Sequence, residues 1–140
     1  MDRPAIERLV RYYETLTPDA VRHLPEYYAA DAYFKDPFNE VRRVEEIQAI
    51  FARMYEQVHE PRFKVLQTVC EHDDAFLVWE MEFRFGAKSK VEVVRGVSHI
   101  RLDAGGKVTW HRDYWDTGEE LYQKIPVLGT FFRWLRRRAH

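Results

Sequence analysis

Residues 75–85 alternate between apolar and polar side chains, the pattern of a β-strand with one buried face. The residues that share the apolar face are Leu77, Trp79, Met81, Phe83 and Phe85. Such a strand is stable only when neighbouring strands pair with it and other elements cover its apolar face. The flanking sequence predicts those partners, because further β-rich segments occupy residues 63–70, 91–102 and 107–115 and are separated by polar turns.

The first half of the chain predicts the elements that cover this sheet. Apolar residues recur at helical spacing over 6–13 and 47–58. Another helix is expected to begin at Thr17 and to include Tyr28, with Pro25 kinking or splitting it. A short extended segment follows and ends at Asp36 and Pro37. Helices followed by a meander of strands predict an α+β fold in which a curved antiparallel sheet wraps around the N-terminal helices.

Composition excludes several classes of protein. The chain has 140 residues, enough for one domain, and its 22 basic and 23 acidic residues give a net charge of −1, which does not favour nucleic acid as a partner. No apolar run is long enough for a transmembrane segment, and the first residues lack a signal peptide, so we expect a cytoplasmic protein. The single Cys70 excludes an internal disulfide. Aromatic residues make up 15% of the chain, which suits a deep apolar core or pocket.

The last part of the chain predicts a separate element. We expect one domain over residues 1–116 and a helical tail over 117–140. Apolar residues at helical spacing in this tail predict that it packs on the domain or on a partner subunit.

Three segments resemble the NTF2-like superfamily, and most closely its SnoaL-like and ketosteroid-isomerase-like branch. They are Tyr28-Ala29-Ala30-Asp31-Ala32-Tyr33-Phe34-Lys35-Asp36-Pro37, Gly96-Val97-Ser98-His99-Ile100, and Gly106-Lys107-Val108 leading into residues 110–116. The resemblance implies a cone-shaped α+β fold with a pocket for a small hydrophobic molecule. The resemblance says little about which reaction the protein catalyses, because this fold occurs in isomerases, hydrolases, cyclases and proteins without activity.

The resemblance also implies site residues. Asp36 matches the aspartate before proline that acts as general base in ketosteroid-isomerase-like enzymes. The family's oxyanion-hole tyrosine corresponds to Tyr12, with Tyr13 as the alternative. The family's second oxyanion-hole donor is a protonated aspartate, and its position corresponds to Ser98. A serine hydroxyl can also donate a hydrogen bond, but it is a weaker acid than a carboxyl group.

The limonene-epoxide-hydrolase-like enzymes also have this fold, and one of their catalytic aspartates lies in a short segment that resembles residues 111–116 of this chain. This resemblance implies a role for Asp113. The partner Arg-x-Asp pair of that group is missing here. Glu80 and Glu82 are nearby, but alternation places them on the face opposite Trp79. Epoxide hydrolysis is therefore the less favoured reaction.

Strand alternation brings the candidate residues to one side of the sheet. His111 and Asp113 share a face with Trp115, and Ser98 on the preceding strand is expected to point the same way. With Asp36, these polar groups would meet in a pocket whose walls include Phe34 and Trp79. His111 and Asp113 could also ligate a metal, but the spacing shows no third ligand, so we predict no metal and no cofactor.

Each candidate also has a structural interpretation. Asp36 could simply stabilise the turn before Pro37. Asp113 could form an ion pair with Arg112 or Arg95, and His111 could be a hydrogen-bonded core residue.

The sequence leaves two functional hypotheses. The first is a protein that binds a small hydrophobic molecule, possibly as a cofactor-free isomerase or polyketide-type cyclase, with proton transfer by Asp36 or Asp113. The second is a ligand-binding or protein-interaction module without catalysis. Valines on the uncovered face of the sheet, including Val69, Val78 and Val97, predict a homodimer through that face.

Overall fold

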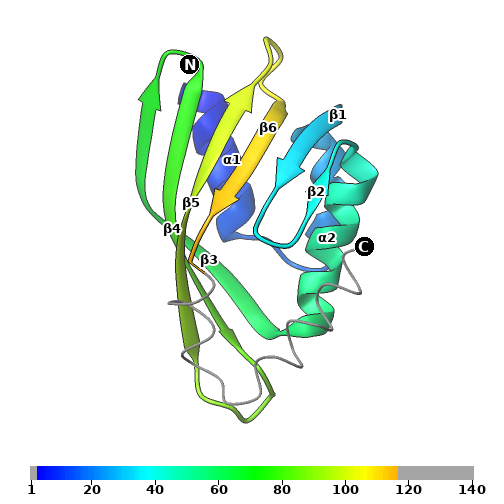
Figure 1. Ribbon diagram of the computed structural model, residues 1–140, viewed down its shortest axis with the longest axis vertical. Coiled ribbons are helices and arrows are strands. Elements are labelled where there is room, and N and C mark those ends of the chain that lie inside the picture. Colours follow the sequence, from blue (N-terminus) through cyan, green and yellow to red (C-terminus); the bar gives the residue numbers. More distant parts are fainter. Residues whose placement is uncertain (1–2, 117–140) are drawn as a thin grey trace.

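The computed structural model describes residues 3–116 of the chain (Figure 1). The helices are α1 (Arg3–Glu14), the 3-10 helix η1 (Ala20–Glu26) and α2 (Val44–Gln57). The strands are β1 (Tyr28–Lys35), β2 (Glu40–Val41), β3 (His59–Glu71), β4 (Asp74–Arg84), β5 (Glu92–Leu102) and β6 (Val108–Tyr114). The predicted tail helix and the predicted domain boundary concern residues outside this described part and stay predictions.

The strands form one six-stranded sheet in the order β2-β1-β6-β5-β4-β3. The predicted meander is confirmed, because β3 to β6 pair successively and antiparallel. The expectation of a wholly antiparallel sheet needs one correction, since β1 pairs with β6 in parallel. A parallel pair cannot be joined by a hairpin, and here the intervening chain contains β2, α2 and three strands of the meander. The sheet is therefore mixed within an α+β fold.

The second predicted helix ends earlier than its apolar spacing indicated. The Thr17 Oγ1 accepts a hydrogen bond from the backbone N–H of Ala20 at 3.1 Å, but the helix begins at Ala20, so its N-cap position is Asp19 and not the predicted Thr17. Pro25 lies inside the short 3-10 helix, and Tyr28 already belongs to strand β1. Because proline has no backbone N–H and its ring clashes with the preceding turn, a regular helix does not continue through this position. Tyr28 thereby becomes a residue of the sheet.

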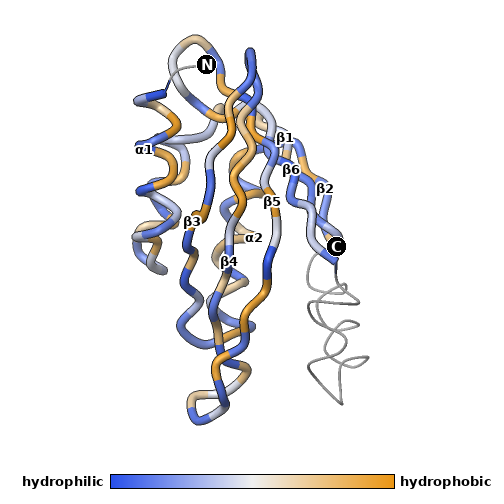
Figure 2. Tube along the Cα trace, turned by 90° about the vertical axis from the view of Figure 1, so that its left-hand side faces the viewer, coloured by the Kyte–Doolittle hydropathy of each residue, from blue (hydrophilic) through white to orange (hydrophobic). Residues whose placement is uncertain are grey.

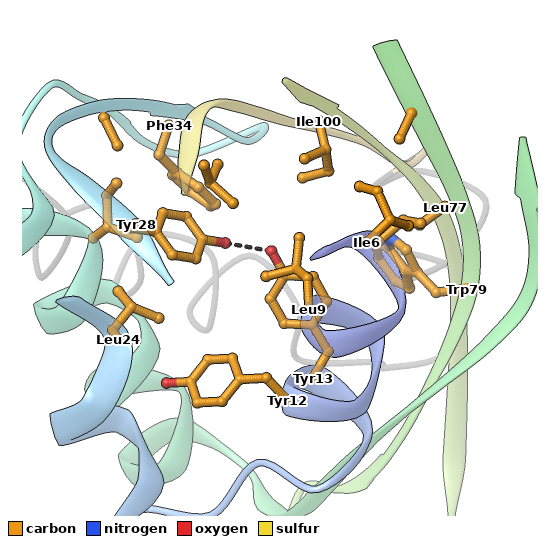
Figure 3. Packing of buried hydrophobic residues seen from close by; sticks show 14 of the residues in the cluster. Ile6, Leu9, Tyr12, Tyr13, Leu24, Tyr28, Phe34, Leu77, Trp79 and Ile100 are labelled. Carbon is orange, nitrogen blue, oxygen red and sulfur yellow. Dashed lines mark hydrogen bonds between the residues drawn. The ribbon is translucent and has the colours of Figure 1, made fainter. Parts of the chain in front are cut away.

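One face of the meander is buried, as the alternation predicted. On β4 the buried side chains are Ala75, Leu77, Trp79 and Phe83, whereas Phe76 is exposed. The hydropathy colours along β3, β4 and β5 change back and forth in the same way (Figure 2). Contacts join α1 to β3, and α2 to β1 and β3. The core therefore lies between the helices and one face of the sheet, where Figure 3 shows Tyr13 of α1 facing Tyr28 of β1, and Ile6 of α1 beside Leu77 of β4.

Candidate functional site

A cavity of about 190 Å³ opens between α2 and the inner face of the sheet. Most of its wall is apolar, from side chains on β1, α2 and the meander that include Phe34, Phe51, Met54, Trp79, Phe83 and Trp115. Polar side chains enter it from α1, from the turn after β1, from α2 and from strands β5 and β6. Apolar walls with a few convergent polar groups are typical of small-molecule sites.

The cavity brings together nearly all of the residues that the sequence singled out. Asp36, Ser98, His111 and Asp113 all line it, as do Tyr13 and the predicted wall residues Phe34, Trp79 and Trp115. Tyr12 lies outside the lining. Its hydroxyl donates to the backbone oxygen of Ala20 at 2.9 Å, and its ring stacks on Tyr27 with centroids 4.0 Å apart. Of the two tyrosines that the resemblance left open, Tyr13 is therefore the one at the cavity.

Asp113 accepts hydrogen bonds from two neighbouring side chains. His111 Nε2 lies 2.6 Å from its Oδ1, and Ser98 Oγ donates to the same oxygen at 2.5 Å. Trp79 Nε1 in turn donates to Ser98 Oγ at 2.9 Å. The residues predicted as possible ion-pair partners contact other groups: Arg112 lies over the Tyr114 ring and Arg95 pairs with Glu80. Asp113 thus belongs to a polar network at the floor of the cavity.

The network continues through Tyr28, which the sequence analysis missed. The Tyr28 hydroxyl lies 2.6 Å from His111 Nδ1 and also bonds the Tyr13 hydroxyl (Figure 3). A carboxylate only accepts, so His111 Nε2 carries a proton toward Asp113, and in the neutral imidazole Nδ1 then accepts from Tyr28. Burial raises the pKa of both phenols well above the usual range, so both keep their protons near neutral pH. No simple alternation revealed this residue, because Ala30 is exposed and the pairing register of β1 shifts between Tyr28 and Tyr33.

Asp36 stabilises a turn, as its structural interpretation predicted, and its side chain also lines the cavity. Its Oδ1 accepts the backbone N–H groups of Phe38 at 2.8 Å and Asn39 at 2.7 Å. The Asn39 amide donates to Oδ1 at 3.0 Å and to Oδ2 at 3.1 Å. Burial nevertheless raises the pKa of Asp36 from 3.8 to about 6, the Asp113 charge adds to the increase, and the Phe38 N–H opposes it. A raised pKa was expected from two carboxylates sharing an aromatic pocket, and near 6 it suits a proton-transfer group.

The remaining acidic candidates face away from the cavity. Glu80 pairs in register with Arg95, their side chains form a 3.4 Å ion pair, and neither residue lines the cavity. Within residues 3–116, no group of three His, Cys, Asp or Glu side chains is arranged to hold a metal ion. In that same part of the chain, no helix is long and apolar enough to cross a membrane.

Comparisons with solved structures find the same fold in proteins of low sequence identity. TsrD from Streptomyces laurentii superposes with a TM-score of 0.74 at 19% identity, over 90% of this chain and 98% of that one. A candidate SnoaL-like polyketide cyclase from Shewanella putrefaciens gives 0.70 at 18% identity, over 88% of both chains. An LEH-like epoxide hydrolase from M. tuberculosis gives 0.69 at 14% identity, over 95% of this chain and 91% of that one. A comparison with curated proteins found no match.

The comparison with protein families is more specific than the structural likenesses. The model of the SnoaL-like domain matches residues 9–111, which include Tyr13, Asp36 and His111 and most of the sheet. Since this match covers well over half of the sequence and the fold agrees with it, the chain belongs to the SnoaL-like domain family.

Proposed function

We propose that this protein binds a small hydrophobic molecule in the cavity and moves a proton on it with Asp36, without a cofactor. The observation that carries the proposal is a partly buried carboxyl group whose pKa is raised to about 6 and which lines an aromatic pocket. Such a carboxylate is ionised at neutral pH and basic enough to take a proton from carbon next to a carbonyl group. Isomerisation and polyketide-type cyclisation both use such a step.

The buried tyrosines supply the second part of the proposed chemistry. Negative charge develops on the carbonyl oxygen when the neighbouring carbon loses its proton, and a hydroxyl that donates to this oxygen lowers the barrier. Tyr13 lines the cavity, and its hydroxyl can rotate its proton from Tyr28 toward a ligand oxygen. His111 holds the Tyr28 hydroxyl through a hydrogen bond at Nδ1, and Asp113 holds His111 through one at Nε2. They act in this proposal as positioning residues.

Deuterium exchange tests the proposal with a simple aromatic ketone. 2-Tetralone is incubated with the protein in D₂O, and loss of its α-proton signals is followed by NMR. The wild-type protein should accelerate exchange, and Asp36→Asn should lower that acceleration by about 10²–10⁴-fold, the usual contribution of a general base. The matched control is Asp31→Asn, which changes an exposed aspartate on β1, the strand that precedes Asp36. Unchanged exchange in Asp36→Asn would contradict the assigned role.

The alternative function is a binding module without catalysis. Binding of the ketone to the wild-type protein, with no exchange above the background rate, would favour this alternative. A cytoplasmic location stays a prediction from the sequence in either case.

A homodimer through the outer face of the sheet is part of the same proposal. Four large apolar side chains are exposed there, namely Leu66 at 48%, Val69 at 43%, Phe76 at 36% and Tyr114 at 48%. Neighbouring apolar side chains of this size usually mark an interaction surface. Light scattering should give twice the chain mass of 16.9 kDa, and Val69→Arg should shift the particle toward the monomer. A wild-type particle of 16.9 kDa at high concentration would refute the dimer.

A further inference from the structure

Helix α2 contributes two polar side chains to the otherwise apolar part of the cavity wall. Arg53 and Gln57 both line the cavity and are both partly buried. They are four residues apart on one helix, so their side chains project from the same face, one turn apart. Neither residue entered the proposed proton transfer. Their position therefore needs a separate explanation.

Arg53 has an unusual electrostatic environment. Of the Arg and Lys side chains in residues 3–116, it alone lines the cavity. Ion pairs within this part of the chain join Arg43 to Glu45 and Arg95 to Glu80, for example, but none involves Arg53. A guanidinium group beside apolar walls is less hydrated than one in open water, and a nearby anion is attracted to it more strongly. The cavity thus offers a cation without a partner inside the described protein.

The two carboxyl groups of the cavity restrict where an anionic group could lie. Asp113 comes from β6 and Asp36 from the turn after β1, whereas Arg53 comes from α2. An anion beside either aspartate would be repelled, and one beside Arg53 would be attracted. A ligand with one negative group would therefore bind in one orientation.

We infer that the ligand is an amphipathic acid, with an apolar ring system against the aromatic walls and an oxyanion, such as a carboxylate, held by Arg53 and Gln57. The planar guanidinium can donate two parallel hydrogen bonds to such a group, and the Gln57 amide can donate a third. The inference rests on the proposed function, because it requires that the cavity accepts an apolar molecule. It adds the charge of that molecule and the direction in which it lies.

Two fluorescent probes with the same aromatic skeleton test the charge preference. 1-Anilinonaphthalene-8-sulfonate carries an oxyanion, and N-phenyl-1-naphthylamine is its neutral counterpart. Each probe should displace the other from the wild-type protein if they share the cavity. Arg53→Met keeps an apolar stem of similar length and removes the charge. It should weaken binding of the sulfonate about tenfold or more, as expected for loss of a charge-assisted hydrogen bond, and leave the neutral probe within about twofold.

The matched control is Arg43→Met, which removes the same charge from the beginning of α2, outside the cavity lining. This variant should bind both probes as the wild type does. Equal affinity of the sulfonate for wild type and Arg53→Met would overturn the inference and leave the proposed function intact, provided that the neutral probe binds. An equal loss for both probes would also overturn it, since Arg53 would then contribute only apolar contact. Failure of both probes to bind the wild-type protein would refute the proposed function as well.

Discussion

Replacement of Asp36 by asparagine should make the folded protein more stable at neutral pH while removing its activity. The new side chain keeps an oxygen that can accept the backbone N–H groups of Phe38 and Asn39. The amide nitrogen of the new side chain would face the Asn39 amide group, which donates a hydrogen bond to Asp36 in the wild type. Asn39 Oδ1 is buried and has no hydrogen-bond partner within the described residues, so rotation of that amide would provide an acceptor. Asp36→Asn therefore keeps both backbone hydrogen bonds of the turn and loses one of the two hydrogen bonds between the side chains of residues 36 and 39.

The size and sign of the effect follow from the pKa of Asp36. The unfolded carboxyl group ionises near 3.8, whereas the folded one keeps its proton up to about pH 6. Unfolding therefore releases a proton between these values, and the stability of the wild type falls as the pH rises from 3.8 through 6. The difference of about two pH units corresponds to about 3 kcal/mol. The Asp36→Asn variant has no ionisable group at this position. Its free energy of unfolding should therefore equal that of wild type near pH 4 and exceed it by about 1–3 kcal/mol above pH 7.

Urea denaturation followed by tryptophan fluorescence measures this difference. The free energy of unfolding of both proteins is determined at several pH values from 4.5 to 8, and the difference between them should grow with pH. Asp31→Asn is the control, because that aspartate is exposed. A difference that does not change with pH, or a variant less stable than wild type at pH 8, would refute the reasoning about burial of Asp36.

Two further substitutions test the packing and the polar network behind the cavity. Gly96→Ala should destabilise the fold by about 1–3 kcal/mol, because a Cβ there would lie 2.5 Å from Cζ2 of Trp79, and a urea midpoint equal to that of wild type would contradict this. Tyr28→Phe leaves His111 Nδ1 without its 2.6 Å partner and should cost about 1–3 kcal/mol, measured in the same way, with ¹⁵N NMR of the imidazole reporting the changed hydrogen bond. Wild-type stability together with an unchanged imidazole spectrum would mean that Tyr28 does not support the network.

The sequence by itself determined which residues share a face of the sheet. Side chains alternate along any extended strand, so the alternation over residues 75–85 predicts its buried face without knowledge of distant segments. The same rule placed His111 and Asp113 together on one side of β6. The resemblance to the superfamily then added Asp36, whose place at the cavity could not follow from periodicity alone.

Only the tertiary structure decided which of these groups touch. Neighbouring positions on an α-helix point about 100° apart, so Tyr12 and Tyr13 face different surroundings, and only the packing of α1 showed that Tyr13 reaches the cavity. Tyr28 and His111 are 83 residues apart and meet because β1 pairs in parallel with β6, an arrangement that no local pattern encodes. Arg53 was not among the sequence candidates, because only the position of α2 beside the cavity brings its side chain into the lining. Periodicity reports which way a side chain points from its own element, whereas contact depends on where the other elements lie.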